Sequence, residues 1–458
     1  MGEYVPNELP VRAKSNKPLP LGGALKAEFP FDPEWRNLNH GSFGTFPTFV
    51  QEKLREYQTR CEARPDKFIR YEYPALLDAS RAAAAEILHA PVETVVFHGN
   101  ATEGVNTVLR NLVWAEDGKD VIITFTTAYE ACAKAADFLE EYYEGKVQHR
   151  EIQLVYPIED DAVVAKFRDT VKALETEGKR ARICLFDVVS SRPGIVFPHR
   201  EMIKACKELG VLSLVDGAHS IGLVPLNLPE DDPDFFTSNC HKWLHTPRGC
   251  SVFYVPLRNQ HLIRTALGTS HGYMPKAKVR GSPLPPSSSK TPFEMLFQFV
   301  GTRDNTPYLC VKDAVQWRRE VLGGEDRIRS YIWDLNKKGS RLVAEELGTH
   351  VLSNSTGTAL NCGMANIALP IWVGDKGAGA RESDVVLPKD KASAIFNWML
   401  ETFIAEYKTF VVLYADQGRF WTRLSSQVYL DLEDYRFAAK ALGEMVERLR
   451  KEEYKGKV

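Results

Sequence analysis

Short apolar runs alternate with helical patterns through the first two thirds of the chain. Phe235 and Phe236 open one such run, and the others lie at 94–97, 120–125, 182–187, 211–215 and 252–255. Runs of this length predict buried strands, and helical patterns separate them, for example at 199–209 and after Tyr129. Strands that alternate with helices at this spacing indicate a mostly parallel sheet with helices on both faces.

The last third of the chain mixes its elements in a different order. A helical pattern follows Pro307 and continues through Arg341. Strands are then expected at 365–369, 409–414 and 420–425, with helices at 391–406 and at the basic C-terminal end. These patterns predict a smaller C-terminal α+β domain. The predicted divisions are an N-terminal arm at 1–30, a large domain at 31–305 and a small domain at 306–458.

Two segments lack a periodic pattern. Residues 1–30 are polar and contain several prolines, and we expect this arm to lie on the surface of a neighbouring unit. Residues 271–291 are rich in Pro and Ser, which predicts an exposed and mobile loop.

The bulk composition excludes several classes of protein. Among the 458 residues 44% are hydrophobic and the net charge is −2, which gives no reason to expect nucleic acid or a membrane surface as a partner. No apolar run approaches the roughly 18 residues that span a bilayer, and the N-terminus lacks the apolar core of a secretory signal. The eight cysteines show no metal-binding spacing. We therefore expect reduced thiols, no metal and a cytoplasmic location.

The stretch Asn239-Cys240-His241-Lys242-Trp243 follows one predicted strand, and Asp216 ends another. A lysine amine forms a Schiff base with the aldehyde of pyridoxal phosphate (PLP), and a carboxylate keeps the pyridine nitrogen of that cofactor protonated. The two residue types together suggest a PLP site. The alternative for this pair alone is a surface lysine and an aspartate that caps a helix.

Two further stretches have both a functional and a structural interpretation. After the strand at 94–97 the chain turns at Asn100 into a helix, and Glu103 completes a capping-box-like pattern. The free N–H groups of that helix start could bind phosphate, although a plain strand–helix unit explains the same residues. The turn-rich stretch LNHGSFG at 38–44 lies either at the edge of the active site or in an ordinary loop before a helix.

Taken together, seven motifs in one order resemble the class V aminotransferase branch of the PLP-dependent fold type I enzymes. They are LNHGSFG, NATEGVN, SSRPG, VDGAHSIG, NCHKW, GTRD and WTRLS. The resemblance runs from about residue 35 to 445 and is greatest to the isopenicillin N epimerase-like subgroup, in particular to the fungal carbon–sulfur lyases of ergothioneine biosynthesis. It implies a large domain with a mostly parallel sheet flanked by helices and a smaller C-terminal α+β domain.

The resemblance also implies roles for individual residues. Lys242, Tyr129 and Asp216 would be catalytic. The cofactor would be bound by Ala101, Thr102, Tyr129, Ser191, Asp216, His219, Asn239, His241, Lys242 and, from the neighbouring subunit of a homodimer with active sites at its interface, Thr302. The amino-acid substrate would be bound by Asn39, His40, Phe43 and Arg423, whose planar guanidinium suits a carboxylate.

Three positions depart from the pattern of the family. Tyr129 stands where many relatives have a histidine, Ser191 where other branches have an asparagine, and Asn239 where a phosphate-binding serine is common. Cofactor binding is still expected, but at these three positions the contacts with the cofactor would differ from those of the family.

The implied reaction is β-elimination from hercynylcysteine sulfoxide, which gives ergothioneine, pyruvate and ammonia. Lys242 would remove the Cα proton, and Tyr129 would either protonate the leaving oxygen or only stack on the cofactor. Phe43 would either contact a trimethylammonium group or belong to the core.

Three alternatives are open. A cysteine desulfurase needs a nucleophilic cysteine on a mobile loop, and the glycine-bearing loop at 374–388 has none. For Cys132 and Cys240, near the predicted site, a small buried apolar role is expected. An epimerase or transaminase would use the same Lys242 and Asp216. A non-catalytic scaffold would have no need of Lys242, Asp216 and Arg423 together.

Overall fold

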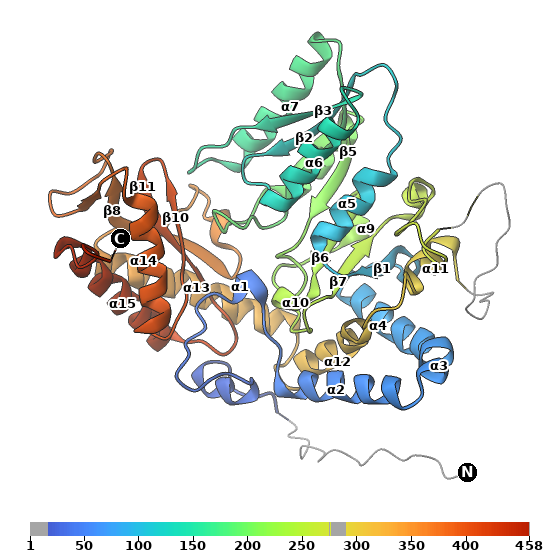
Figure 1. The fold of residues 1–458 in the computed structure, drawn as a ribbon, viewed down its shortest axis with the longest axis horizontal. Coiled ribbons are helices and arrows are strands. Elements are labelled where there is room, and N and C mark those ends of the chain that lie inside the picture. The colour runs from blue at the N-terminus through green and yellow to red at the C-terminus, as the bar shows by residue number, and fades with distance from the viewer. Residues whose placement is uncertain (1–16, 274, 276–289, 458) are drawn as a thin grey trace.

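The computed structural model describes residues 17–273, 275 and 290–457, and it contains two separate sheets (Figure 1). The first sheet has seven strands in the order β1-β7-β6-β5-β4-β2-β3. Strand β7 pairs antiparallel with β1 and β6, and the other pairs are parallel. The strands are β1 (Val95–His98), β2 (Asp120–Phe125), β3 (Val147–Ile152), β4 (Arg180–Asp187), β5 (Leu212–Asp216), β6 (Phe235–Asn239) and β7 (Ser251–Tyr254). The predicted mostly parallel sheet is thereby confirmed.

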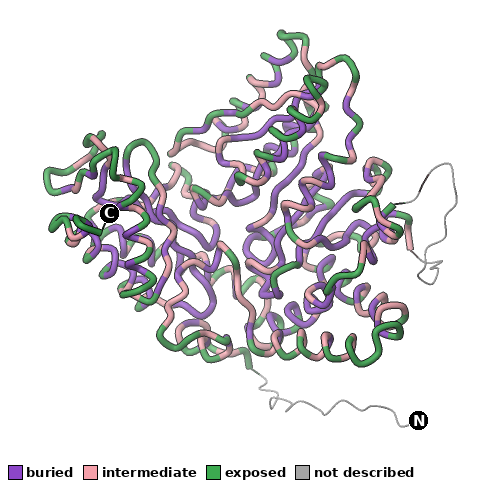
Figure 2. Tube along the Cα trace, in the orientation of Figure 1, coloured by how far each residue is buried: buried purple, intermediate pink, exposed green. Residues whose placement is uncertain are grey.

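Helices cover both faces of this sheet because neighbouring residues of its strands point in opposite directions. In β2, Val121 and Ile123 join one buried cluster and Ile122 joins another on the other face. Figure 2 shows the strands in the middle of the sheet as mostly buried, whereas the edge strand β3 is largely intermediate and the outer helices carry many exposed residues. The helices of this part are α1 (His40–Phe43), α2 (Thr48–Ala63), α3 (Pro65–Lys67), α4 (Tyr73–Leu88), α5 (Ala101–Asn111), α6 (Glu130–Tyr142), α7 (Asp160–Thr176), α8 (His199–Glu208), α9 (Leu228–Asp231), α10 (Cys240–Trp243) and α11 (Pro292–Gln298).

The second sheet has four strands in the order β10-β11-β8-β9. Its strands are β8 (Met364–Val373), β9 (Val385–Leu387), β10 (Val412–Asp416) and β11 (Arg419–Ser425). Helices α14 (Ala392–Ala405) and α15 (Leu432–Arg450) accompany it, as the α+β expectation requires. Short single turns of other helix types lie at Gly23–Glu28, Phe68–Glu72, Val92–Thr94, Leu257–Leu262 and Thr358–Leu360.

The single helical pattern predicted from Pro307 through Arg341 is wrong in one respect, because the structure divides it into two helices. Helix α12 (Thr306–Glu320) packs on α2 and α4, whereas α13 (Glu325–Leu347) packs on α15 and β8. Gly323 and Gly324 separate them with φ angles of +87° and +91°, a region that glycine adopts without steric cost. The division into arm, large domain and small domain stays a proposal, and this packing favours a boundary at the two glycines.

The described part of the N-terminal arm packs on its own chain, and the predicted contact of the arm with a neighbouring unit stays a prediction. The N–H of Leu19 donates to Val321 O at 2.8 Å, and the N–H of Gly22 donates to Val428 O at 2.7 Å. Leu25 and Phe29 are buried in the main core, so these apolar side chains fix the arm. Residues 1–16 and most of the predicted loop at 271–291 lie outside the described residues.

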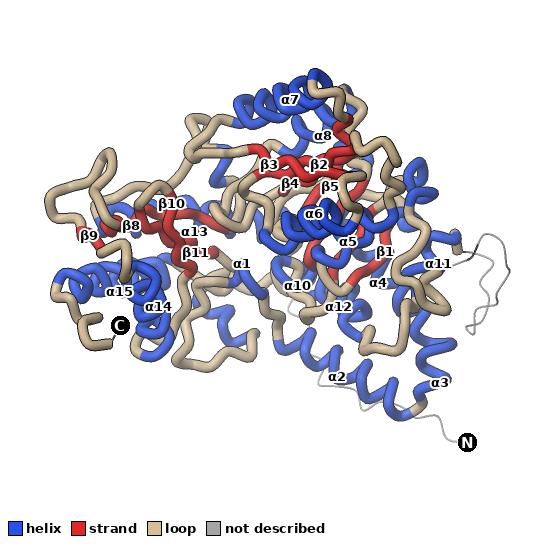
Figure 3. Tube along the Cα trace, turned by 45° about the horizontal axis from the view of Figure 1, so that its top comes forward, coloured by secondary structure: helices blue, strands red, loops and turns tan. Residues whose placement is uncertain are grey.

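Helix α1 lies between the two sheets, next to α10 (Figures 1 and 3). The carboxyl ends of β4, β5 and β6 point toward this region, where parallel sheets commonly bind their ligands. Within the described parts of the chain, no helix is both long and apolar enough to cross a membrane.

Candidate active site

Lys242 lies on α10, directly after the buried strand β6. The stretch LNHGSFG, predicted as turns, forms the short helix α1 and packs against this lysine. His40 makes a short hydrogen bond from its ring Nε2 to the backbone carbonyl of Lys242. At Gly44 the φ angle is +64°, and a Cβ atom there would lie 1.7 Å from the carbonyl oxygen of His241. Only glycine allows the two segments to approach this closely.

The Lys242 amine is buried among the other predicted catalytic residues. Its Nζ lies 3.1 Å from His219 Nε2 and 5.9 Å from the centre of the Tyr129 ring. Burial lowers the pKa of Lys242 to about 8, with Arg423 acting in the same direction and Asp216 opposing it. A lysine with this pKa is substantially neutral near pH 8 and can therefore act as a nucleophile or a base.

Asp216 ends β5, and its carboxylate is buried. It accepts a hydrogen bond from the Ala218 N–H at 2.9 Å and one from the Cys132 thiol at 3.4 Å. Cys132 is buried as predicted, but it is also a donor to the predicted catalytic carboxylate. Burial raises the pKa of Asp216 and outweighs the two donors and the charge of Lys242, which act in the opposite direction. A protonated pyridine nitrogen would supply the missing cation.

The structure adds a second carboxylate that the sequence did not single out. Asp187 ends β4 and pairs in register with Asp216 of the neighbouring strand. Burial and the charge of Asp216 both raise the pKa of Asp187. Its position at the end of a predicted strand, parallel to the one that ends in Asp216, is the signal that could have identified it.

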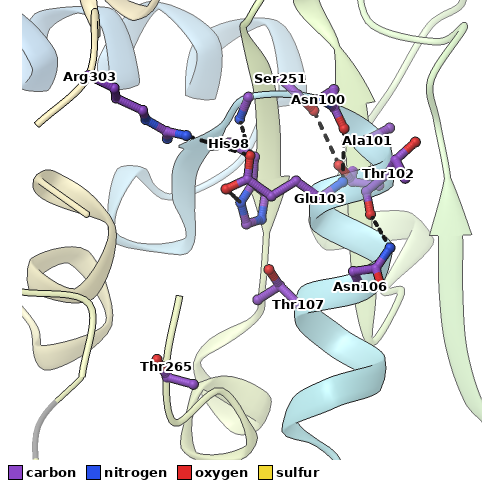
Figure 4. A network of polar contacts seen from close by, with 12 residues as sticks. His98, Asn100, Ala101, Thr102, Glu103, Asn106, Thr107, Ser251, Thr265 and Arg303 are labelled. Carbon is purple, nitrogen blue, oxygen red and sulfur yellow. Dashed lines mark hydrogen bonds and ion pairs between the residues drawn. The ribbon is translucent and has the colours of Figure 1, made fainter. Parts of the chain in front are cut away.

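The start of α5 provides the candidate phosphate site, with different contacts from those expected (Figure 4). Asn100 caps the helix as predicted, because its side chain accepts the Glu103 N–H at 2.9 Å. The predicted capping box is wrong: the Glu103 carboxylate accepts from Gly99 N–H at 2.9 Å instead and lies 3.7 Å from Arg303.

The backbone N–H of Ala101, predicted as a phosphate donor, donates to Asn239 Oδ1 at 2.9 Å. Because the oxygen of this amide faces Ala101, its NH₂ group is directed elsewhere as a donor. Thr102, one residue further along, is half-buried beside it. His241 donates from Nδ1 to Cys250 O at 3.1 Å, and burial lowers the pKa of His241 to about 4. Its Nε2 could donate to a phosphate only after gaining a proton.

Arg423 lies on β11 and is buried, yet it has no carboxylate partner within the described residues. One terminal nitrogen donates to Ser191 O at 2.6 Å and to Ser191 Oγ at 3.1 Å. The other donates to Asn39 Oδ1 at 3.0 Å and to Ser42 Oγ at 2.9 Å. Its Nε has no partner among the described residues, and burial lowers the pKa of Arg423 to about 10. A buried cation held only by neutral acceptors is well suited to bind an anionic ligand.

The remaining predicted residues lie at the outside of this group or away from it. Phe43 is 71% exposed and Tyr129 is 48% exposed, so Phe43 does not belong to the core. Ser191 contacts Arg423, which places it at the predicted carboxylate site. Thr302 is exposed in the loop before α12, and its predicted role needs a second copy of the chain. Ser42, which links Asn39 to Arg423, was not predicted because small hydroxyl residues in turns are common.

The residues fit the predicted cofactor in chemistry and in placement. They provide a neutral amine for its aldehyde, buried carboxylates without a cation for its pyridine nitrogen, and polar groups at a helix start for its phosphate.

The family model described as Aminotransferase class-V matches residues 46–278, half of the chain. The chain belongs to the class V aminotransferase family. This family uses pyridoxal phosphate, so the predicted cofactor and a PLP-dependent enzyme are confirmed.

The similar proteins share most of their length with this chain. The L-cysteine desulfhydrase-like protein lolT2 of Epichloe uncinata is 34% identical over 95% of this chain and 96% of the relative. The hercynylcysteine sulfoxide lyase of Schizosaccharomyces pombe is 31% identical over 92% of this chain and 97% of the relative. The isopenicillin N epimerase of Streptomyces clavuligerus is 27% identical over 74% and 82% of the two chains. The suspected subgroup is thereby confirmed.

Solved structures confirm the fold. A complex of the cystine C–S lyase C-DES with cysteine persulfide has a TM-score of 0.70 at 18% identity and covers 92% of this chain and 99% of that one. At this identity the similarity concerns the fold alone. The predicted fold type I arrangement is therefore correct.

The cysteines of this chain lack the character of a sulfur-accepting nucleophile. All eight lie in the described residues and none forms a disulfide; seven are buried, and Cys61 is half-buried on α2. Burial raises the pKa of Cys61 and raises that of Cys362 to about 12. A reactive thiol needs the opposite environment, with a lowered pKa and access to solvent.

Proposed function

We propose that the chain is a carbon–sulfur lyase that cleaves hercynylcysteine sulfoxide, a sulfoxide of a cysteine conjugate, by β-elimination. The observation that carries the proposal is the pairing of a buried, largely neutral lysine with a buried arginine that has no acid partner among the described residues. Helix α1 and the residue before it connect the two, because Asn39 and Ser42 contact Arg423 while His40 contacts the Lys242 backbone. The amine of a bound amino acid would thus lie near Lys242 and its carboxylate near Arg423, and both of these residues contact the same short segment of the chain.

The residues divide the work as follows. Arg423 binds the substrate carboxylate, which fixes the orientation of the Cα–H bond. Lys242 removes the Cα proton, for which its lowered pKa prepares it. Bound PLP supplies the electron sink that makes this proton acidic. The electron pair of the Cα–H bond expels the sulfur from Cβ, which leaves as a sulfenate. The three remaining carbons end as pyruvate after loss of ammonia and addition of water.

Tyr129 is our candidate for the proton donor to the leaving oxygen. Its side chain is half exposed, and its ring lies 5.9 Å from Lys242 Nζ. A phenol at this position could reach both the cofactor and the sulfur group of a bound substrate. Tyr129→Phe should lower kcat for the sulfoxide by about 10²-fold, at the low end of general acid catalysis, and leave the cofactor absorbance unchanged. A change of less than threefold in kcat would leave only a stacking role.

Elimination of sulfide from free cysteine is the second candidate, and it uses the same lysine and arginine. It is favoured by the similarity to proteins named as L-cysteine desulfhydrases. A desulfurase is disfavoured, because the described cysteines include no accessible thiol of lowered pKa. An epimerase or transaminase remains compatible with Lys242 and Asp216 alone.

The proposal includes a homodimer, in which Thr302 of one chain would contact the cofactor phosphate of the other. The exposed position of Thr302 supports this assignment. Sedimentation of the purified enzyme tests it, and a monomer that retains full activity would contradict it. A cytoplasmic location is also part of the proposal and is supported by the unpaired cysteines; cell fractionation would test it.

Product analysis tests the reaction. The PLP-loaded enzyme is given hercynylcysteine sulfoxide, free cysteine or a transamination pair, each with a thiol reductant that converts the sulfenic acid to the thione. We expect pyruvate and ergothioneine from the sulfoxide, with a kcat/KM at least about 10² times that for cysteine. Sulfide and pyruvate formed faster from cysteine would establish a desulfhydrase, and alanine from cysteine would establish a desulfurase.

A further inference from the structure

Trp243, the residue after the catalytic lysine, is fully buried and held in one orientation. Its Nε1–H donates to His219 Nδ1 at 3.1 Å. Two glycines pack against the indole: a Cβ atom at Gly363 would lie 2.8 Å from Trp243 Cη2, and one at Gly41 would lie 3.3 Å from Cζ2. The indole therefore has no room to turn its N–H away from His219.

This hydrogen bond decides which nitrogen of His219 carries hydrogen. An indole N–H is a donor only, so His219 Nδ1 must be the acceptor and must be without hydrogen. His219 is buried, and burial together with the nearby charges of Lys242 and Arg423 lowers its pKa well below the ordinary value. The ring is therefore neutral, and its single hydrogen is on Nε2.

The position of that hydrogen constrains the lysine. His219 Nε2 lies 3.1 Å from Lys242 Nζ, and an Nε2–H at this distance needs an acceptor. An ammonium group has three donors and no lone pair, whereas a neutral amine has one lone pair to accept this hydrogen. The arrangement Trp243–His219–Lys242 is thus satisfied only when the lysine is neutral.

We propose that Trp243 is a positioning residue: its indole fixes His219 with hydrogen on Nε2, and His219 in turn favours the neutral amine of Lys242. The inference deepens the proposed function and rests on Lys242 being the lysine that binds the cofactor and removes the proton. With phenylalanine at position 243, the imidazole of His219 would be free to carry its hydrogen on Nδ1. Its Nε2 could then accept a hydrogen bond from the Lys242 ammonium.

Other charges also act on this lysine, and a test must hold them constant. The ionisable groups that face Lys242 come from β4, β5, β11 and α6, from the turn after β5 and from the residue before α6; they are Asp187, Asp216, Arg423, Cys132, His219 and the ring of Tyr129. His241 and His40 in addition face His219. Exchanging Trp243 for phenylalanine changes none of these groups.

The first experiment reads the hydrogen position directly in the cofactor-free protein. The chain is labelled with ¹⁵N-histidine, and the His219 signals are assigned by their loss in His219→Gln. We expect an unprotonated Nδ1 and a protonated Nε2 in the native chain, and a substantial population of the opposite tautomer in Trp243→Phe. Trp333→Phe is the matched control, because the Trp333 indole donates to Leu223 O, away from this histidine. A native His219 with hydrogen on Nδ1, or unchanged signals in Trp243→Phe, would overturn the inference.

The second experiment reads the lysine. The rate at which the cofactor-free protein captures PLP is followed by visible absorbance as a function of pH. The native midpoint should lie near the lysine pKa of about 8. In Trp243→Phe it should rise by about one pH unit, the size expected when a hydrogen bond to a charged group is gained. In a His219→Gln background the same exchange should cause no shift, since glutamine has no ring tautomers.

The two experiments separate this inference from the proposed function. If Trp243→Phe does not fold, the His219 tautomer measured in the native chain still tests whether the Trp243 indole holds the hydrogen on Nε2. If the enzyme turns out to act on another substrate, the tautomer and the capture midpoint are unaffected. Equal midpoints in the native chain and Trp243→Phe would contradict the proposed effect on Lys242.

Discussion

Two fully buried arginines in this chain have opposite surroundings. Arg318 on α12 donates from Nε and from one terminal nitrogen to the Glu325 carboxylate, both at 2.6 Å. Its other contacts are Trp243 O, Gly222 O and the ring of His245. Arg423 has only neutral acceptors, and its Nε has no partner within the described residues.

The difference separates a structural cation from a binding cation. Arg318 ties α12 to the turn after α10, and its charge is neutralised inside the protein. Arg423 keeps an uncompensated charge in a buried position, which costs stability and which an anionic ligand would offset. Lys242 differs from both arginines, because burial lowers its pKa to about 8 and its amine lies 3.1 Å from the neutral ring of His219. A buried arginine held only by neutral acceptors is thus suited to bind an anionic group of a substrate, whereas one paired with a carboxylate is not.

The largest expected effect concerns Lys242. Lys242→Ala should lower kcat/KM by about 10⁴-fold, because this change removes both the group that binds PLP and the general base. Pyruvate release under saturating PLP measures it. Activity within tenfold of the native enzyme would show that another residue is the base.

The second largest expected effect concerns Arg423, and it is a loss in kcat/KM that comes mainly from weaker substrate binding. Arg423→Gln should lower kcat/KM about 10³-fold, mainly through a higher KM, because it removes a charge-assisted bidentate pair with the substrate carboxylate. The free energy of unfolding should change by less than about 1 kcal/mol, since the lost charge had no acid partner. A loss carried by kcat alone would place Arg423 outside substrate binding.

Arg318→Gln should show the reverse pattern. It leaves Glu325 and two backbone carbonyls without their donor, and we expect a loss of about 3 kcal/mol in the free energy of unfolding, reduced by the partial exposure of Glu325. KM of the folded fraction should stay within twofold. Urea denaturation and steady-state kinetics measure the two quantities, and a large rise in KM without a loss of stability would erase the distinction between the arginines.

A further prediction concerns the stability of the cofactor-free chain. Lys242 has a folded pKa of about 8 against 10.5 for an ordinary lysine, so below pH 8 the protonated buried amine destabilises the fold by roughly 3 kcal/mol. Between pH 8 and 10.5 the unfolded chain binds more protons than the folded chain, and stability therefore rises with pH. Lys242→Met should gain roughly 3 kcal/mol at pH 7, and the gain should vanish toward pH 10.5. A gain that does not depend on pH would contradict the lowered pKa.

The sequence predicted the elements and residues that depend on local pattern. The run at Asp120–Phe125 is apolar on both faces apart from Asp120 and Thr124, and the structure forms β2 over the same residues. Lys242 and Asp216 were found because each directly follows or ends a strand. The break between α12 and α13 was missed, since the helical pattern continues on both sides of Gly323 and Gly324.

Contacts between distant parts of the chain could not be read from the sequence. Asn39 and Arg423 are 384 positions apart, and only the folded chain shows that they share a hydrogen bond. The role of Trp243 likewise depends on two glycines from other segments that fix the plane of its ring. The hydrogen bond from Ala101 to Asn239 was not predicted for the same reason, because Asn239 lies at the end of a distant strand.

The most direct test of the unpaired Arg423 compares one cysteine-conjugate sulfoxide with its carboxamide, which lacks the negative charge but has nearly the same shape. The native enzyme should prefer the carboxylate by about 10³-fold in kcat/KM, and Arg423→Gln should lose nearly all of this preference. If Arg423→Gln keeps the native preference, then Arg423 does not bind the substrate carboxylate and the comparison of the two arginines fails.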